Sequence, residues 1–353
     1  MLNDEEETIA GEEEEKEFLD EDVVYQINTF GADYTVDGLV KRFERGDIFR
    51  PKFQRNFVWT WPQASRFIES ILLGLPIPSV FLYREEATQK HLIVDGLQRL
   101  TTLNAFHKGR FPGTQRVFTL KGVKKKFEGK SLEELDEEDK RRFEDTVIHA
   151  MIIQQIAPAE DNSAVFHIFD RLNSNGTPLQ AQEIRAAVYH GTFQELLGEL
   201  NNDEDWRGIF GPIHKRSKDQ ELILRFLALY NNRENYEKPM KSFLNNYISA
   251  YRNAEEGQLG EFRDEFHETV QRAREALGDR AFRPQRSLNV AVYDALMVAI
   301  AECPDADADS IKEAYGELIA DDDFLKLCSE ATSDGSSVNG RINMAVEAIN
   351  AAT

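Results

Sequence analysis

The hydrophobic pattern of this 353-residue chain changes its period near residue 157. Before that point, β-rich runs alternate with amphipathic helical segments. The runs lie at 23–27, 79–83, 91–94 and 147–156, the helices at 35–45 and 61–73, and a charged surface loop and helix are predicted within 124–130 and 131–139. After it, nearly every segment carries its apolar residues at helical spacing, as at 164–172, 222–230, 243–251, 262–277 and 288–301. This order predicts an α+β chain, in which an N-terminal α/β domain is followed by an all-α helical region.

Charge is distributed very unevenly along the chain. Residues 1–22 hold twelve acids and one base, a net charge of −11, whereas residues 41–130 hold eighteen Lys/Arg and seven Asp/Glu, a net charge of +11. The acidic block is predicted to be disordered, either as a solubilising tail or as an arm that occupies the basic segment. The whole-chain charge of −21 argues against indiscriminate binding to DNA phosphates, while the basic segment keeps a local polyanion site open.

The apolar runs and the first residues of the sequence lead us to expect neither secretion nor a membrane-spanning segment. No apolar run approaches the roughly 20 residues of a membrane helix, the longest being 71–78 and 290–300. The first residues include neither a basic region nor an apolar region of a signal peptide, so we expect a cytoplasmic protein without membrane contact. Cys303 and Cys328 lack the spacing of a zinc site, and we expect two buried free thiols in preference to a disulfide.

The most informative segment is KHLIVDGLQRLTTLNAF, at 90–106. An apolar strand runs into Asp95 and Gly96, and a helix with one apolar face is predicted to start immediately afterwards. A helix N-terminus presents unpaired N–H groups, so this junction could hold an anion with the help of Arg99. Asp95 would then hold Mg²⁺ or orient Arg99; alternatively, Asp95 is only the helix N-cap and Arg99 only a surface base.

Two further segments concentrate polar chemistry. The stretch RPKFQRNFVW at 50–59 interleaves bases with aromatic residues, a pattern that suits stacking on a nucleobase beside a phosphate. In the alternative reading, its aromatic side chains belong to the core and only Gln54 and Arg55 are exposed. The stretch at 169–185 holds an Asn-Ser-Asn-Gly turn that is more polar than a turn requires, and it includes Asn173 and Glu183.

Three phrases occur together in the order and spacing of one known family, namely PKFQRNFVWTWPQASRFIESILLGLPIP, LIVDGLQRLTTL and FDRLNSNGTPLQAQEIRAAVY. On these, residues 35–190 resemble the GmrSD N-terminal-domain family, whose fold is similar to those of ParB and sulfiredoxin. The resemblance implies a ParB/sulfiredoxin-like nucleotide-binding domain at 23–190. The charge pattern adds a disordered acidic tail at 1–22 before it, and the helical periodicity adds a helical domain at 191–353 after it. Sulfiredoxin chemistry itself is excluded, because it needs a Cys in the phosphate loop and the chain has none before Cys303.

The resemblance also implies a set of site residues. The DGQQR motif of the family marks a nucleotide-binding and nucleotide-hydrolysing centre, and here it reads DGLQR, with Leu97 at its third position. It implies catalytic roles for Asp95, Gln98 and Arg99, with Asp95 also as the Mg²⁺ ligand. It implies nucleotide binding by Gln54, Arg55, Gly96, Arg99, Thr101 and Asn173. Leu97 would weaken turnover if the Gln of the family contacts nucleotide or water, and would change little if that position faces the core. Leu172 stands where ParB-type relatives have a Glu before the Asn.

We therefore expect a nucleotide-binding and nucleotide-hydrolysing sensor subunit of a phage-defence or modified-DNA restriction system. It would use Mg²⁺ and a nucleoside triphosphate, with modified or foreign DNA and a separately encoded nuclease as partners. The C-terminal stretch has His267 as its only His after His214, so we do not expect a fused HNH nuclease. Two alternatives stay open: a non-catalytic DNA- or protein-binding regulatory module, and a nuclease built on the ParB-like domain itself.

Overall fold

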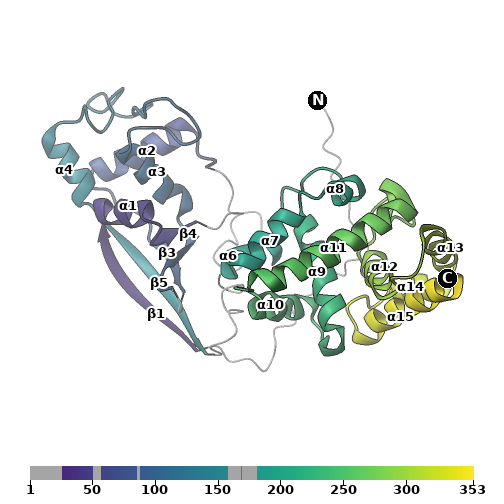
Figure 1. Cartoon of the computed structure of the whole chain (residues 1–353). Helices are drawn as coiled ribbons and strands as arrows, with labels where there is room; N and C mark the ends of the chain where they lie inside the picture. The colour runs from purple at the N-terminus through teal and green to yellow at the C-terminus, as the bar shows by residue number, and fades with distance from the viewer. Residues whose placement is uncertain (1–25, 51–56, 86–87, 158–167, 169–180) are drawn as a thin grey trace. The chain divides into compact units, whose positions relative to one another are not determined.

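A mixed five-stranded sheet organises the N-terminal part of the chain in the computed structural model, which describes residues 26–50, 57–85, 88–157, 168 and 181–353. Its strands lie in the order β1-β5-β3-β4-β2 (Figure 1). They are β1 (Gln26–Thr35), β2 (Ile48–Phe49), β3 (Val80–Arg84), β4 (His91–Asp95) and β5 (Val147–Ala157). β5 pairs antiparallel with β1 and parallel with β3, while β4 pairs antiparallel with β3 and parallel with β2.

The helices of this part begin and end where the sequence supplies caps. They are α1 (Val36–Glu44), α2 (Trp61–Leu72), α3 (Leu97–His107), α4 (Glu137–Asp145) and α6 (Ala181–Val188). The Thr35 hydroxyl accepts a hydrogen bond from the Gly38 N–H at the start of α1, and α2 starts with Pro62 in its first turn. Gly46 and Gly74 follow the ends of these two helices with φ of +75° and +68°, the left-handed conformation that closes a helix.

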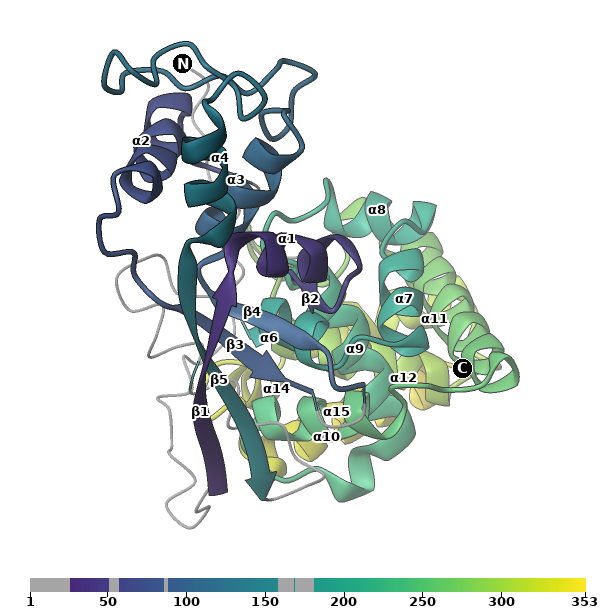
Figure 2. The same ribbon diagram turned by 90° about the vertical axis from the view of Figure 1, so that its left-hand side faces the viewer.

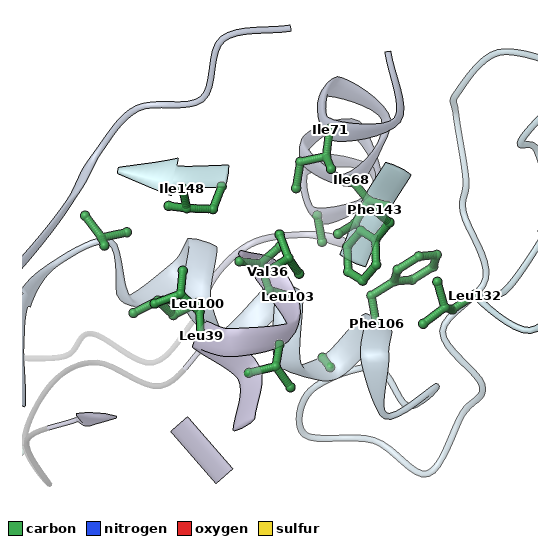
Figure 3. Close-up of a cluster of buried hydrophobic side chains, with 14 of the residues drawn as sticks. Val36, Leu39, Ile68, Ile71, Leu100, Leu103, Phe106, Leu132, Phe143 and Ile148 are labelled. Atoms are coloured by element: carbon green, nitrogen blue, oxygen red, sulfur yellow. The ribbon is translucent and has the colours of Figure 1, made fainter. Parts of the chain in front are cut away.

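One hydrophobic core fills the space between the sheet and its helices (Figure 3). Leu39, Ile68 and Leu103 enter it from α1, α2 and α3, and Ile148 enters it from β5. Phe106 stacks edge to face on Phe118 and Phe143 with ring centroids 5.3 Å apart. The long connection between α3 and α4 is therefore attached to the core by its own aromatic side chains.

The C-terminal part of the chain is built of helices alone in the residues that the structure describes. They are α7 (Thr192–Leu200), α8 (Glu204–Phe210), α9 (Lys218–Asn232), α10 (Met240–Ala250), α11 (Glu256–Leu277), α12 (Val290–Glu302), α13 (Ala308–Leu318), α14 (Asp322–Leu327) and α15 (Gly335–Ala352), with the 3₁₀ helices η1 (Arg233–Asn235) and η2 (Gly278–Arg280). α12 is the central helix, because all residues from Val290 to Ile300 are buried and it packs against α9, α11 and α15. An apolar run of this length is typical of a buried core helix.

The chain divides into two compact units, Val24–Val188 and Tyr189–Thr353. The predicted α+β architecture is confirmed, since a mixed sheet with its helices precedes a helical region. The predicted helices at 35–45 and 61–73 and the strands at 79–83, 91–94 and 147–156 are present with small shifts of their ends. The helical segment predicted from the apolar spacing around Ile168 lies outside the described residues except for that residue, and so does the acidic tail at 1–22.

Two smaller expectations can also be compared with the structure. A strand was predicted to end at Ile27, but β1 continues to Thr35, because residues 28–35 pair with β5 along its length. Cys303 and Cys328 are both buried and free, so the disulfide alternative is wrong. Among the residues described, no helix combines the length and the apolar character that crossing a membrane requires.

Candidate functional site

The predicted strand-to-helix junction is present between β4 and α3. Asp95 is the last residue of β4, Gly96 is the N-cap of α3, and Leu97 begins the helix. Gly96 has φ of +99°, and a Cβ there would lie 2.7 Å from Cγ1 of Val80 on the neighbouring strand. Only glycine fits both the left-handed backbone and this close approach. The tight turn therefore brings the start of α3 directly onto the end of the strand.

Asp95 and Arg99 form an ion pair across this turn. The Arg99 guanidinium donates to Oδ2 of Asp95 at 2.6 Å. The Arg99 side chain is 15% exposed and the Asp95 side chain 45% exposed. The structure therefore corrects the alternative in which Asp95 is the N-cap and Arg99 a surface base: Gly96 is the N-cap, and Asp95 orients a mostly buried guanidinium.

The first turn of α3 keeps its amide groups available. The first backbone hydrogen bond of the helix runs from the Leu100 N–H to the Gly96 carbonyl at 2.9 Å, and no side chain caps the helix. The N–H groups of Leu97, Gln98 and Arg99 precede that bond, so they point out of the helix end. Together with the Arg99 guanidinium they form an arrangement suited to an anion. Thr101 lies half-buried in the next turn.

Gln98 connects α3 to the segment that follows the basic-aromatic stretch. Its Oε1 accepts hydrogen bonds from the N–H groups of Val58, at 3.0 Å, and Trp59, at 3.4 Å. The side-chain carbonyl of Gln98 therefore holds the backbone at residues 58 and 59, while its Nε2 group could contact a ligand. Phe57 and Trp59 pack against the core, as the alternative reading of this stretch has it. Gln54 and Arg55 lie outside the described residues.

Leu97, the departure from the family motif, faces the core. It is 8% exposed and belongs to the same hydrophobic cluster as Leu100 and Leu103. Of the two possibilities raised by the sequence, the structure supports the one in which the substitution changes little at the site. Among the other predicted residues, Asn173 lies outside the described residues, and Glu183 is buried on α6.

Asp95 is the carboxylate that the junction offers to a metal ion. Within the described part of the chain, no three His, Cys, Asp or Glu side chains are grouped so that they could hold a metal by themselves. Mg²⁺ in nucleotide sites does not need such a group, because one or two carboxylates are completed by phosphate oxygens and water. The half-exposed Asp95 carboxylate fits that requirement when a polyphosphate supplies the other ligands.

Two residues at the junction were not predicted from the sequence. Val80 limits position 96 to glycine, although it lies sixteen residues earlier in the chain. The second is Val58, whose amide shows that Gln98 has a positioning role. Neither contact leaves a local signal, because each joins segments that only the sheet and the core bring together.

A cavity of about 420 Å³ lies in the other unit, away from all the predicted site residues in sequence. Its lining includes Tyr230, Glu261, Glu265 and Glu268. Burial raises the pKa of Glu265, and the neighbouring Glu261 raises it further, against a hydrogen bond from Asn231 that lowers it. The cavity is therefore acidic and unsuited to a phosphate.

The comparison with protein families matches residues 36–190 to the family described as GmrSD restriction endonuclease, N-terminal domain. The matched range begins with α1, so it contains strands β2 to β5 and the β4–α3 junction but not β1. A search among curated proteins finds no match to the chain. The resemblance drawn from the three sequence phrases is thus confirmed over this range.

Proposed function

Because residues 36–190 match the GmrSD restriction endonuclease N-terminal-domain family, we propose that this chain is the nucleotide-binding sensor subunit of a restriction system. It binds a nucleoside triphosphate with Mg²⁺ at the β4–α3 junction, hydrolyses it, and acts with a separately encoded effector on modified or foreign DNA. The observation that carries the nucleotide site is the Arg99 guanidinium, which Asp95 holds at the uncapped N-terminus of α3. The role in restriction is supported by the family match.

The junction supplies the three components of a phosphate site. The positive end of the helix dipole, with its free amides, stabilises an exposed anion by about 0.3–1 kcal/mol. That is too little for tight binding on its own. Arg99 adds a planar donor that can bind two phosphate oxygens at once. Gly96 lets the phosphate approach the backbone closely, since no side chain stands between them.

Asp95 has two roles in this proposal. It fixes the Arg99 side chain before the ligand arrives, so less side-chain freedom is lost on binding. It would also hold a Mg²⁺ ion, which would supply positive charge beside the phosphate oxygens, or position the attacking water.

The remaining residues are assigned from the family resemblance. Gln98 holds the 58–59 backbone and offers its Nε2 group to phosphate or water. Thr101 contributes its hydroxyl one turn further along α3. Gln54 and Arg55 precede Val58 by only a few residues, and we place them with Asn173 at the nucleotide.

A non-catalytic regulatory module is the second candidate function. It is favoured by one observation: Asp95, the single carboxylate at the end of β4, is already paired with Arg99. A site of this kind would bind nucleotide or another anion without turning it over. The two functions differ in phosphate release and agree on anion binding.

A thermal-shift series with the four nucleoside triphosphates and Mg²⁺ tests the site. A ligand at one hundred times its Kd stabilises a protein by about 2.7 kcal/mol, which is several degrees for a unit of this size. We expect Arg99→Ala to lose that shift. The matched control is Arg45→Ala, because Arg45 also pairs with an aspartate, Asp47, at 2.9 Å.

The control pair lies away from the junction within the same unit. Asp47 precedes β2, whose first residue pairs with His91 at the start of β4, whereas Asp95 is at the other end of β4. Arg45→Ala should therefore keep the shift. An unchanged shift in Arg99→Ala would remove the site assignment, and a shift without phosphate release would select the regulatory module over the hydrolase.

A further inference from the structure

The connection between α3 and α4 carries an unusual run of positive charge. Residues 110–126 include six Lys/Arg and no Asp/Glu. All six side chains are exposed, as is Arg66 on the neighbouring helix α2. We refer to the seven residues together as the basic face, namely Arg66, Arg110, Arg116, Lys121, Lys124, Lys125 and Lys126.

The connection passes beside α2 (Figure 2), and hydrogen bonds attach it there. The Trp61 indole N–H donates to the Thr119 carbonyl at 2.6 Å, and the Lys121 N–H donates to the Ser65 hydroxyl at 3.0 Å. One helical turn further on, the Lys124 N–H donates to a carboxylate oxygen of Glu69 at 2.7 Å. The connection and α2 are therefore held side by side, and both carry exposed bases.

An aromatic stack stiffens the same surface. The Trp61 ring lies parallel to the Phe111 ring at 4.1 Å, and Nζ of Lys121 lies 4.3 Å from the Trp61 ring. Phe118 contacts Trp61 edge to face at 5.8 Å and is itself fully buried. The connection that carries these bases is thus anchored to the core of the unit, and Lys121 packs on the Trp61 ring.

The carboxylates that contact the basic face do not balance it. Glu69 and Glu128 accept hydrogen bonds from backbone N–H groups of the connection. Asp139 is the one of the three that pairs with a base, Lys126, at 2.6 Å. Seven bases thus stand against the three carboxylates that contact the connection, and one of the three pairs with a base. Such a surface attracts a polyanion.

We propose that residues 1–22 of the same chain occupy the basic face. They carry a net charge of −11, with twelve carboxylates and one lysine. The 25 residues before β1 can span roughly 80 Å when extended, at about 3.3 Å per residue. That length is more than twice the roughly 33 Å of the ten-residue strand β1, so the segment is long enough to pass the whole of that strand.

The tether favours this segment over nucleic acid as the occupant. A segment of the same chain acts at an effective concentration in the millimolar range. DNA must approach a chain whose net charge is −21, and the segment presents carboxylates where phosphates would lie. The acidic segment is therefore an internal competitor that any external polyanion has to displace.

A labelled peptide of residues 1–22 tests the proposal by fluorescence anisotropy at about 50 mM and about 500 mM salt. We expect the chain lacking residues 1–22 to bind the peptide at low salt and to release it at high salt, where the screening length falls from about 14 Å to about 4 Å. The full chain should bind it at least tenfold more weakly, because its own segment occupies the face.

Charge variants of the shortened chain locate the contact. Lys124→Gln with Lys125→Gln should weaken peptide binding by roughly 2- to 30-fold, at about 0.2–1 kcal/mol for each exposed ion pair. The matched control replaces two exposed lysines of the other unit, Lys312 and Lys326, with Gln, and it should bind as the shortened chain does.

Three results would overturn the proposal. In the first, the full and the shortened chain bind the peptide with equal affinity. In the second, the control variant weakens peptide binding as much as the Lys124→Gln, Lys125→Gln variant does. In the third, a 30-base-pair DNA duplex binds equally well with and without residues 1–22. The third result would assign the basic face to nucleic acid. The outcome is separable from the nucleotide site, because Arg99→Ala in the shortened chain should bind the peptide normally.

Discussion

Gly96 determines how closely the backbone of the junction can approach a ligand, and its replacement can be predicted at the scale of one residue. Gly96→Ala adds a methyl group 2.7 Å from Cγ1 of Val80, at a φ of +99°. A non-glycine residue in such a conformation costs about 1–3 kcal/mol before any clash is counted. We expect urea unfolding to show a loss at the upper end of that range.

Gly109→Ala separates the two causes of this loss. Gly109 has φ of +71°, and a Cβ there would meet nothing within 4 Å, so its replacement introduces backbone strain alone. Gly96→Ala should therefore lower the free energy of unfolding more than Gly109→Ala does. The additional change Val80→Ala should lower the free energy of unfolding less in the Gly96→Ala variant than in the wild type. Equal losses for the two glycines would show that Val80 does not limit the junction.

The residues of the junction illustrate what a sequence can predict at this scale. Asp95, Gly96 and Arg99 are neighbours along the chain, so a strand followed by a helix is enough to place them together. The amide partners of Gln98 are forty residues away, and nothing near Gln98 indicates them. Contacts of that kind depend on how the sheet and core bring segments together, which local patterns do not encode.

Three helices of the C-terminal unit are joined by one buried carboxylate. Asp294 on α12 is fully buried and accepts hydrogen bonds from Arg225 on α9 and from Arg341 on α15. The Arg225 Nε lies 3.0 Å from Oδ1, and one Arg341 nitrogen lies 3.2 Å from Oδ2. The acid that interrupts the longest apolar run of the sequence is therefore the centre of a buried ion-pair triad.

Asp294→Asn tests the contribution of this triad to the packing of the helices. It leaves two buried guanidinium groups facing a neutral amide, and we expect the free energy of unfolding to fall by about 3–5 kcal/mol. Asp334→Asn is the matched control, because Asp334 pairs with Lys238 at 2.8 Å but its side chain is 43% exposed. This change should lower the free energy of unfolding by less than about 1 kcal/mol. Similar losses in the two variants, measured by urea unfolding, would contradict the argument.

Element boundaries were predictable where the chain carries its own caps. Thr35 and Gly46 bracket α1, and Pro62 and Gly74 bracket α2, so both helices lie where the sequence puts them. α4 is different: a surface helix was expected within 131–139, but it runs over Glu137–Asp145. Phe143 explains the shift, because it is fully buried against Phe106, and that tertiary contact extends the helix beyond its most charged residues.

At the scale of the whole molecule, each of the two compact units contains its own core. The core of the first gathers residues from Val36 to Ile152, between the sheet and its helices. The second is centred on the buried helix α12. Two cores of this kind predict two cooperative units of unfolding within one chain.

Hydrogen exchange measured by mass spectrometry tests this prediction with the two destabilising variants already described. Gly96→Ala should speed exchange in α3 and leave α12 at its wild-type rate, because the strain lies in the first unit. Asp294→Asn should do the reverse, since the triad lies in the second. Calorimetry should then show two thermal unfolding transitions, and each variant should lower the midpoint temperature of only one of them. If either variant accelerates exchange equally in α3 and α12, the units unfold together, and a change at the β4–α3 junction would be transmitted to the helical unit through global stability.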